Sequence, residues 1–476
     1  MIQIENLSFK YSGSDLDSIS SIDLNIAEGE CVLICGESGC GKSTLMKAVN
    51  GLIPHYYEDG NLKGSVKCCG LDVASTPLEK LSDNIGSVFQ NPRSQFFCVD
   101  TTGELAFGCE NQGMDPQNIT ERISDVVDTM NLDSLMERNI FALSGGEKQK
   151  IACASISVMR PDVYVLDEPT SNLDQDGIDM LGEVLRIWKS EGKTIIVAEH
   201  RLGWLKGIAD RVVIIRDGII DLEYSANEFW NKKTDELNAH GLRAFNTKKN
   251  FTDYKPGFYP LDGDMQNCEP DDECGDKVYR FSDFRYSYKK GKNVLNIDKL
   301  VVQPHSVVAV IGHNGVGKST FSKCLCGLMK GFKGYVTRGS KRFKGRKLID
   351  LSYMVMQDVN HQLFTDSCLE EVMISMEEDD REAALQVLDK MDLGKYADVH
   401  PMSLSGAQKQ RLAICQAYVS KREIIVFDEP TSGLDYKHMR KTAELIKEIS
   451  KDKTIFVITH DMELVEACCS HVLNLG

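Results

Sequence analysis

Short apolar runs and amphipathic stretches alternate along this chain. Residues 30–35, 163–167 and 194–198 are short, mostly apolar runs with β-branched side chains, a composition that predicts buried strands. Residues 119–132 carry apolar side chains at helical spacing, which predicts an amphipathic helix. Residues 1–7 alternate between apolar and polar positions and predict a first strand. The polar residues that interrupt these runs carry the information about chemistry.

A glycine-rich loop follows the first of these apolar runs. Gly36–Ser43 fits the pattern G-x-x-x-x-G-K-[ST], and residues 44–50 predict the start of a helix. Glycines let such a loop turn its backbone N–H groups toward phosphate oxygens, and the helix N-terminus adds partial positive charge. Lys42 is expected to reach the β- and γ-phosphates, and Ser43 to bind Mg²⁺. The predicted nucleotide-binding residues are Gly36, Ser38, Gly39, Gly41, Lys42, Ser43 and Thr44.

The same loop occurs a second time. Gly312–Ser319 fits the same pattern after the apolar run 307–311, and the two lysines are 318 − 42 = 276 residues apart. This spacing indicates a tandem duplication, so each half of the chain can be compared with the other. The second set of predicted nucleotide-binding residues is Gly312, Asn314, Gly315, Gly317, Lys318, Ser319 and Thr320.

Polar residues at the ends of predicted strands form another group of candidates. Gln90 follows a short apolar run, and Asp167 and Glu168 end another. Asp167 suits Mg²⁺ binding, and Glu168 suits a base that polarises the attacking water. His200 follows a third run, where it could contact a γ-phosphate. A lone histidine is more often structural, but its position at the end of this ordered series favours a catalytic role.

A serine followed by glycines begins a further predicted helix. Ser144 is expected to be the N-cap residue, with Gly145 and Gly146 leaving the first backbone N–H groups uncovered. This terminus is a second element suited to phosphate.

The second half repeats these motifs in the same order. The counterparts are Gln357, Ser405, Gly406, Gln408, Asp428, Glu429 and His460. The separation shrinks from 357 − 90 = 267 residues for the glutamines to 460 − 200 = 260 for the histidines. The second half is therefore a shortened copy of the first.

One aromatic residue before each glycine loop is a candidate for stacking on adenine. Tyr11 lies 36 − 11 = 25 residues before Gly36. In the second half both Tyr286 and Tyr288 qualify, and the similarity of residues 284–286 to residues 9–11 favours Tyr286. An ordinary tyrosine at a strand end is the alternative interpretation.

Composition limits the class of protein. The chain has 476 residues and 42% apolar content, enough for two domains of about 200 residues with separate cores. Its net charge of −16 disfavours a role in coating nucleic acid. The 16 cysteines lack the spacing of a metal site or a disulfide framework, so we expect buried thiols in a reducing compartment. No apolar run approaches the roughly 20 residues that cross a bilayer.

We expect two domains, at 1–221 and 278–476, joined by a flexible acidic linker at 222–277. The part of the linker from Asp262 to Asp276 contains seven acidic residues and no lysine or arginine. A metal site within it has no support from residue spacing.

Taken together, the ordered motifs resemble those of the ATP-binding cassette (ABC) ATPases over nearly the whole chain outside the linker. The resemblance implies an α/β fold with two P-loop NTPase domains of the ABC type. Each would have a RecA-like core, a helical subdomain between the glutamine and the signature serine, and an N-terminal antiparallel β region. It also implies ATP and Mg²⁺ as cofactors. The implied catalytic residues are Glu168, His200, Glu429 and His460, and the implied Mg²⁺ ligands are Ser43, Gln90, Asp167, Ser319, Gln357 and Asp428.

In this family two cassettes pair head to tail, and each ATP contacts the phosphate loop of one and the signature of the other. The resemblance therefore implies pairing within this chain, with Asp174 and Asp435 at the interface. Ala407 and Glu147 depart from the family's signature glycine and glutamine, and both changes are mild. We therefore expect two sites that hydrolyse ATP.

The residues after both glutamines resemble one branch of the family, the energy-coupling factor (ECF) transporter ATPases of the cobalt/vitamin type. Each glutamine begins Gln-x(4)-Gln followed by apolar residues, and Ala198–Leu202 is similar to the first half of fused two-cassette ECF ATPases. The resemblance implies a docking surface for a membrane scaffold. Packing of its aromatic residues inside the helical subdomain is the alternative. The implied interface residues are Gln95, Phe96, Phe97, Gln362, Leu363 and Phe364.

The resemblance implies a peripheral subunit on the cytoplasmic face of the cell membrane. Its partners would be a transmembrane scaffold (T-type) subunit and a membrane-embedded substrate-binding (S-type) subunit, and no nucleic acid. It would drive uptake of a vitamin, metal ion or similar micronutrient. Tandem sugar-importer ATPases and translation-type tandem ABC proteins that act on ribosomes are the rival interpretations. The acidic linker and the second glutamines favour transport.

Overall fold

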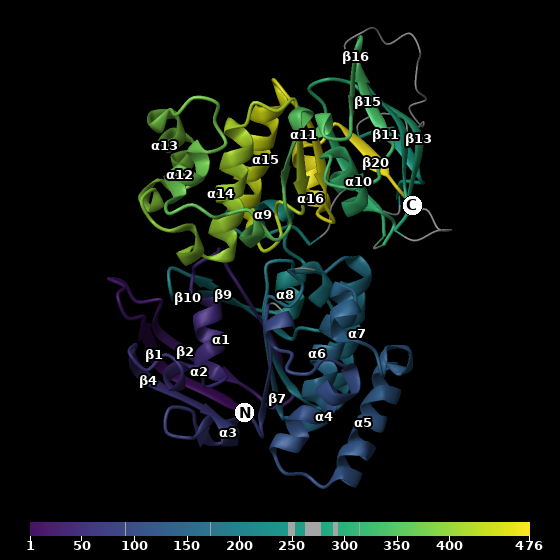
Figure 1. Cartoon of the computed structure of the whole chain (residues 1–476). Helices are drawn as coiled ribbons and strands as arrows, with labels where there is room; N and C mark the ends of the chain where they lie inside the picture. The colour runs from purple at the N-terminus through teal and green to yellow at the C-terminus, as the bar shows by residue number, and fades with distance from the viewer. Residues whose placement is uncertain (91, 172, 246–252, 262–277, 289–293, 314) are drawn as a thin grey trace. The chain divides into compact units, whose positions relative to one another are not determined.

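The structure is a computed structural model that describes residues 1–476 except 91, 172, 246–252, 262–277, 289–293 and 314 (Figure 1). The chain divides into two compact units, residues 1–246 and 247–476. Each unit contains a six-stranded, mostly parallel sheet and a four-stranded antiparallel sheet. The fold is α/β in both units, as the motifs imply.

The mostly parallel sheet of the first unit has the order β10-β9-β3-β8-β7-β6, and only β10 runs antiparallel to its neighbour. Every residue of β3 and β8 is buried, as is typical of parallel strands covered on both faces. The predicted strands are confirmed. The strands are β3 (Cys31–Cys35), β6 (Ile85–Val88), β7 (Val163–Asp167), β8 (Thr194–Ala198), β9 (Arg211–Arg216) and β10 (Ile219–Ser225).

The antiparallel sheet of the first unit contains the N-terminal strand that period-two alternation predicts. Its order is β2-β1-β4-β5. The apolar side of this sheet packs with α1 and one face of the parallel sheet in a shared core. The strands are β1 (Ile2–Lys10), β2 (Ile19–Ile26), β4 (Asn61–Cys68) and β5 (Leu71–Asp72).

The helices of the first unit include the helical subdomain expected between Gln90 and Ser144. It contains α4 and α5, and α5 begins after the N-cap Asp115 and ends at Asn131 in the left-handed region (φ 51°). The helix predicted at 119–132 is confirmed. The helices are α1 (Lys42–Val49), α2 (Leu52–His55), α3 (Leu78–Leu81), α4 (Thr101–Asn111), α5 (Pro116–Met130), α6 (Gly145–Met159), α7 (Gln175–Ser190), α8 (Ala226–Trp230) and α9 (Thr234–Ala239).

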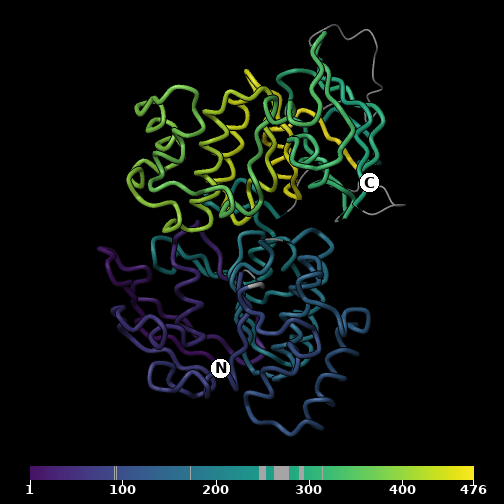
Figure 2. Tube along the Cα trace, in the orientation of Figure 1, coloured from purple at the N-terminus to yellow at the C-terminus, as the bar shows by residue number. Residues whose placement is uncertain are grey.

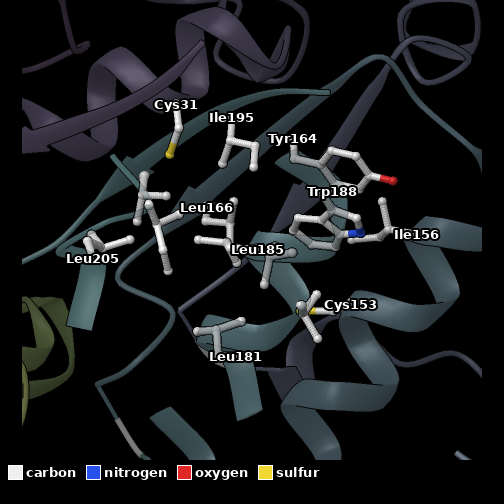
Figure 3. Close-up of a cluster of buried hydrophobic side chains, with 14 of the residues drawn as sticks. Cys31, Cys153, Ile156, Tyr164, Leu166, Leu181, Leu185, Trp188, Ile195 and Leu205 are labelled. Carbon is white, nitrogen blue, oxygen red and sulfur yellow. The ribbon is translucent and has the colours of Figure 1, made fainter. Parts of the chain in front are cut away.

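A stacked aromatic pair joins α6 and α7 to the parallel sheet. The rings of Tyr164 on β7 and Trp188 on α7 lie 3.8 Å apart at 14° (Figure 3). The Trp188 indole N–H donates to Ser157 Oγ on α6 at 2.9 Å. Truncating a buried tryptophan to alanine typically costs about 3–5 kcal/mol. This contact holds the helix that begins at Ser144 against the strand that ends at Asp167.

The second unit, teal to yellow in the trace of Figure 2, repeats this plan in its strand orders. Its sheets have the orders β11-β20-β14-β19-β18-β17 and β13-β12-β15-β16. The strands are β11 (Gly257–Pro260), β12 (Tyr279–Tyr286), β13 (Leu295–Val302), β14 (Val307–Ile311), β15 (Tyr335–Arg338), β16 (Lys341–Lys344), β17 (Ser352–Val355), β18 (Ile424–Asp428), β19 (Thr454–Ile458) and β20 (His471–Asn474). The helices are α10 (Lys318–Leu325), α11 (Lys347–Leu351), α12 (Cys368–Met373), α13 (Arg381–Lys390), α14 (Gly406–Val419), α15 (Tyr436–Ser450) and α16 (Met462–Cys468).

The interval 222–277, predicted as a flexible linker, is folded at both ends. α8 and α9 belong to the first unit, where Phe229 and Leu237 are buried in the core. β11 pairs antiparallel with β20 in the second unit. The sequence hides these elements because their few apolar residues are separated by polar and charged ones. The acidic stretch 262–277 lies outside the described residues.

The cysteines are thiols in the part of the chain that the structure describes. All fourteen described cysteines are free, and eleven of them are buried. Adjacent Cys68 and Cys69 have sulfur atoms 3.9 Å apart without a disulfide. Burial without pairing agrees with the prediction of small apolar side chains. Within the described residues, no helix is long and apolar enough to cross a membrane.

Candidate functional site

Each phosphate loop connects a buried strand to a helix. Gly41 is the N-cap of α1 and has φ 107°, and a Cβ there would lie 2.6 Å from the Ser18 carbonyl oxygen. Gly317 is its counterpart before α10, with φ 111° and 2.4 Å to the Val294 oxygen. Both positions therefore require glycine. Neither helix has a side-chain cap, which suits binding of an anion by the first backbone N–H groups.

The lysine of each loop is folded back inside it. Lys42 is 3% exposed, and its ammonium donates to the carbonyls of Gly36 and Glu37 at 3.0 and 2.9 Å. Lys318 makes the corresponding bonds to Gly312 and His313 at 2.6 and 3.1 Å. The charge of each lysine is therefore held at the centre of its loop. Asn314, predicted as part of the second loop, lies outside the described residues.

One carboxylate ends the corresponding strand of each unit, half-buried Asp167 on β7 and buried Asp428 on β18. Burial raises the pKa of Asp167 to about 6, with a further contribution from the charge of Glu168, while the Ser43 hydroxyl donates to Asp167 at 3.0 Å and opposes the shift. Burial also raises the pKa of Asp428 to about 6, against Lys323 and Lys318. A desolvated carboxylate beside a hydroxyl is a suitable oxygen donor set for Mg²⁺, which binds few protein ligands and keeps phosphate and water. Ser43 and Asp167 therefore suit the ion, and the Mg²⁺ roles of Gln90, Ser319, Gln357 and Asp428 remain predictions.

The parallel sheet brings Gln90, Glu168 and His200 together because β6, β7 and β8 are neighbours and end at the same edge. Gln90 Nε2 donates to Glu168 Oε2 at 2.8 Å, and His200 Nε2 lies 3.3 Å from Glu168 Oε1. Glu168 has φ 45° and Glu429 has φ 50°, a left-handed conformation that is uncommon for glutamate. The same conformation recurs at the equivalent position of both units, and a catalytic role for either glutamate remains a prediction.

The second unit assembles the same residues more loosely. His460 Nε2 lies 3.7 Å from Glu429 Oε1. Among the described residues, Gln357 makes no hydrogen bond to Glu429 and Ser319 makes none to Asp428, and Gln357 is exposed. The predicted set is thus brought to one strand edge in both units, with more internal hydrogen bonds in the first.

The aromatic candidate of the second unit needs correction. Tyr11 Oη lies 3.3 Å from Thr44 Oγ1 beside the first phosphate loop. The matching contact in the second unit is made by Tyr288, whose Oη lies 3.2 Å from Thr320 Oγ1. The prediction of Tyr286 as the counterpart of Tyr11 is therefore wrong.

Strand register explains the error. Asn6 in β1 and Asp283 in β12 both have positive φ, of 47° and 54°, and 283 − 6 = 277. With this offset Tyr286 corresponds to Phe9. The alignment of residues 9–11 with residues 284–286, which rested on their similar sequences, is therefore shifted by two residues from the structural correspondence.

The signature serines cap their helices. Ser144 forms a capping box with Glu147, which accepts the Ser144 N–H at 2.7 Å. Ser405 forms the same box with Gln408, at 2.8 Å. Glu147 departs from the glutamine of the family pattern, but it makes the same capping-box hydrogen bond as Gln408. The nucleotide contacts of these serines, of Gly145, Gly146 and Gly406 and of Gln408 remain predictions.

The aspartates expected at a cassette interface are also helix caps. Asp174 accepts the Gly177 N–H at 3.0 Å and begins α7. Asp435 accepts the His438 N–H at 2.8 Å and its Nδ1 at 2.8 Å, and begins α15. Each of these bonds lies within one unit, and a role at an interface remains a prediction.

The second glutamine of each Gln-x(4)-Gln motif accepts a backbone N–H from the residue just before the first glutamine. Gln95 Oε1 accepts the Phe89 N–H at 3.4 Å, and Gln362 Oε1 accepts the Met356 N–H at 3.2 Å. These glutamines therefore stabilise the loop that carries the first glutamine. A role in binding a partner is not needed to explain their spacing.

The apolar residues after the second glutamines point in two directions. Phe96 packs against the core, and Leu363 is buried at 4% exposure. Phe97 and Phe364 are 74% and 72% exposed. Of the four apolar side chains predicted to form a docking surface, only Phe97 and Phe364 are exposed, and their docking role remains a prediction.

Two buried glutamates anchor this segment, and sequence reasoning missed them. Glu104 Oε2 accepts the N–H groups of Phe97 and Cys98 at 3.0 and 2.8 Å. Glu371 Oε2 accepts those of Phe364 and Thr365 at 2.9 and 2.8 Å. Their separation, 371 − 104 = 267, equals that of the glutamines. This matching separation was the signal in the sequence that could have identified the two glutamates.

The chain matches the family model described as ABC transporter over residues 19–171 and 295–432. It is 40% identical over 478 residues to a protein of Treponema denticola described as an ABC transporter ATP-binding protein, covering 100% of this chain and 95% of the relative. The structure of cbiO1 from Clostridium perfringens, part of the ABC transporter complex cbiONQ, covers 50% of this chain at 28% identity and a TM-score of 0.45, with 94% of its own length matched. The structure titled RNase-L Inhibitor covers 99% of this chain at 21% identity and a TM-score of 0.61, with 88% of its own length matched.

Proposed function

Because the chain belongs to the ABC transporter family and is a tandem, ATP-hydrolysing ABC ATPase, we propose that it is the ATPase subunit of an importer of the energy-coupling factor type. It would couple ATP hydrolysis to uptake of a vitamin, metal ion or similar micronutrient through separate T-type and S-type membrane subunits. The chain would lie on the cytoplasmic face of the membrane as a peripheral subunit.

The proposed chemistry uses the residues at the strand edge. Lys42 and the loop N–H groups would bind the β- and γ-phosphates, with Tyr11 beside the adenine. Ser43 and Asp167 would hold Mg²⁺, which when bound neutralises charge developing on the phosphate oxygens. Glu168 would polarise the attacking water.

His200 and Gln90 support the carboxylate of Glu168 in this proposal. Their side chains lie within 3.3 Å of its two oxygens, so its direction is defined before nucleotide binds. In the second unit Tyr288, Lys318, Asp428, Glu429 and His460 would have the same roles. ATP binding would draw the two units together and hydrolysis would release them, which is the stroke passed to the membrane subunits.

The observation that carries the transport proposal is the braced segment after each nucleotide-facing glutamine. Gln90 contacts Glu168, and only seven residues later Phe97 is exposed, with its backbone N–H held by buried Glu104. The Phe97 ring also stacks on Phe107 at 4.8 Å. A rigid connection of this kind would transmit movement from the ATP site to a partner helix. In the second unit the part of it that recurs is the bond from the Phe364 N–H to buried Glu371.

Affinity purification of the tagged chain from detergent-solubilised native membranes tests the proposal. We expect a polytopic scaffold protein and one or more small membrane proteins to co-purify. Phe97→Ala with Phe364→Ala should reduce their recovery, whereas Leu16→Ala, at a residue 79% exposed elsewhere on the first unit, should not.

Recovery of ribosomal proteins without a membrane partner would contradict the transport proposal. It would favour the translation-type alternative. Equal loss of partners in the Leu16→Ala control would contradict the assigned docking residues.

A further inference from the structure

The two histidine loops differ on either side of the histidine. Residues 199–201 are Glu-His-Arg, and residues 459–461 are Thr-His-Asp. The acidic residue therefore precedes the histidine in the first unit and follows it in the second. Both loops come directly after a buried strand, β8 or β19.

In the first unit Glu199 ties the histidine to the segment after Glu168. Glu199 is 2% exposed, and its Oε1 accepts the N–H groups of His200 and Arg201 at 2.7 and 3.1 Å. Its Oε2 accepts the hydroxyl of buried Thr170 at 2.6 Å. A buried carboxylate with three donors holds both segments in one geometry.

In the second unit Asp461 makes the corresponding contact from a different position. Asp461 Oδ2 accepts the Thr431 hydroxyl at 2.6 Å, and Oδ1 accepts the Leu464 N–H at 3.2 Å. Thr431 is the counterpart of Thr170, since 431 − 170 = 261 and the signature serines have the same separation. The threonine hydroxyl thus donates to a carboxylate at the same distance in both units. That carboxylate directly precedes the histidine in the first unit and directly follows it in the second.

We propose that Glu199 and Asp461 are equivalent positioning residues for His200 and His460, and this rests on the proposed role of those histidines in the ATP sites. The preserved feature is the bond from the threonine hydroxyl to a buried carboxylate. Since two different sequences reach this bond, the contact itself is required rather than one residue type at one position.

The two arrangements place different hydrogen-bond donors on the carboxylates of Glu168 and Glu429. In the first unit the His200 backbone N–H donates to Glu199. The side chain of Gln90 donates to Glu168, and His200 Nε2 lies 3.3 Å from it. In the second unit the His460 N–H and the Thr459 hydroxyl donate to Glu429 Oε2, at 3.4 and 3.3 Å. Glu429 therefore also holds its own histidine loop, a task that Glu199 performs in the first unit.

Exchange of the two arrangements tests the proposal by ATPase kinetics of the purified full chain. Glu199→Thr with Asp461→Ala removes both carboxylates, and we expect kcat to fall about 10-fold with KM for ATP within about 2-fold. Adding Arg201→Asp to this pair installs the second unit's arrangement in the first. It should restore kcat to that of Asp461→Ala alone.

Thermal unfolding midpoints of all variants separate positioning from folding. The proposal is overturned if the pair keeps the kcat of the unmodified chain, or if Arg201→Asp gives no recovery while the midpoint is unchanged. Should the pair not fold, Glu199→Gln replaces Glu199→Thr, and a kcat equal to that of the unmodified chain would again overturn the proposal. Turnover of the purified chain needs no membrane partner, so its outcome is separate from that of the co-purification.

A second inference concerns positive charge on the hairpin β15–β16. Residues 330–349 contain eight lysine and arginine residues and no acidic residue, in a chain of net charge −16. Arg338 pairs with Glu423 at 2.5 Å. The other seven are exposed and make no ion pair with any described residue: Lys330, Lys333, Lys341, Arg342, Lys344, Arg346 and Lys347.

The fold itself does not require this charge. The strand registers Ile2 with Cys68 and Tyr279 with Arg338 make residues 60–79 the counterpart in the first unit. That stretch contains two lysines and two acidic residues. The positive hairpin is therefore specific to the second unit.

We infer that this hairpin binds an anionic phospholipid surface, which rests on the proposed function because such an ATPase works beside a membrane. Exposed lysine and arginine side chains are attracted to anionic lipid headgroups. Single-stranded nucleic acid is less well matched, because it needs aromatic faces for base stacking. Here the Arg342 guanidinium lies 3.5 Å from the Tyr335 ring centroid, and Phe343 packs against the core.

Vesicle flotation tests this inference. We expect the full chain to float with phosphatidylcholine vesicles that contain phosphatidylglycerol, and not with phosphatidylcholine alone, and to be released by high salt. Replacement of Lys341, Arg342 and Lys344 by glutamine should abolish flotation. Replacement of Lys63 and Lys67, on β4 of the corresponding β4–β5 hairpin of the first unit, should not.

Equal flotation with neutral vesicles, or equal loss in the control, would overturn the inference. So would binding of polyuridylate in preference to vesicles. Binding to neither would also overturn it and leave the charges as protection of the edge strand β16 against pairing. None of these results bears on whether membrane proteins co-purify with the chain.

Discussion

Asp167 and Asp428 end the corresponding strands β7 and β18 of the two units. Burial is the main cause that raises the pKa of each from 3.8 to about 6. A carboxyl group whose pKa is higher in the folded chain binds more protons when folded between these two values. Its contribution to the free energy of unfolding therefore falls as the pH rises from about 4 to about 6, and stays low at higher pH.

This predicts the stability of the nucleotide-free chain. Asp167→Asn with Asp428→Asn removes two desolvated charges, so it should raise the unfolding midpoint at about pH 7.5 more than at about pH 5. Calorimetry of both proteins at the two pH values measures the difference. A gain that is independent of pH, or larger at low pH, would contradict the assigned pKa shifts.

Glu168 and Glu429 share an uncommon left-handed backbone conformation and a neighbouring histidine. We predict that both ATP sites are active, so Glu168→Gln and Glu429→Gln should each lower ATP turnover, as measured by phosphate release. Glu147→Gln serves as the control, because Gln408 already makes the equivalent capping bond. If Glu168→Gln kept half of the turnover or more while Glu429→Gln abolished it, the sites would be unequal.

At the scale of elements, the segments that follow Gln90 and Gln357 each depend on a glutamate in the next helix. Glu104 in α4 is 4% exposed and accepts two backbone N–H groups. Removing it leaves both donors without that acceptor, which is costly for buried groups. The same relation links Glu371 in α12 to Phe364 and Thr365.

Glu104→Ala should therefore loosen residues 97–98 without unfolding the first unit. Hydrogen exchange followed by mass spectrometry should show faster exchange there. Glu110→Ala, at the exposed end of the same helix, is the matched control and should leave exchange unchanged. Unchanged exchange in Glu104→Ala would mean that other contacts hold the segment.

At the scale of the whole molecule, each unit has its own cores, and the interval between the two sets of motifs contributes to both. Tyr254, Tyr259 and Leu261 are buried in a cluster with Ile311 of β14 and Val472 of β20. β11 also adds a strand to the edge of the second sheet. A domain boundary at residue 278 would remove these contacts.

We predict that a fragment of residues 253–476 unfolds at a higher temperature than a fragment of residues 278–476. The shorter fragment exposes the apolar cluster and the edge of β20. Circular dichroism during heating compares the two, and 8-anilinonaphthalene-sulfonate binding reports the exposed apolar surface. Equal midpoints would show that β11 contributes little to the second unit.

Local chemistry made much of this protein predictable from sequence. Binding of phosphate by a loop needs glycines, a lysine and a hydroxyl within eight consecutive residues, so Gly36–Ser43 carries its own signal. Strand ends in a parallel sheet meet at one edge, so Asp167, Glu168 and His200 could be expected to meet before their contacts were known. The duplication doubled every such signal.

The sequence alone therefore determined the order of motifs, the two α/β units and the residues at the strand edge. The tertiary structure decided what depends on partners distant in the chain. It assigned Tyr288 through strand register, separated exposed Phe97 from packed Phe96, and joined Glu199 and Asp461 to equivalent threonines. Adjacent residues of similar type can face opposite sides, and a buried carboxylate can reach one hydroxyl from two sequence positions. Only packing distinguishes these cases.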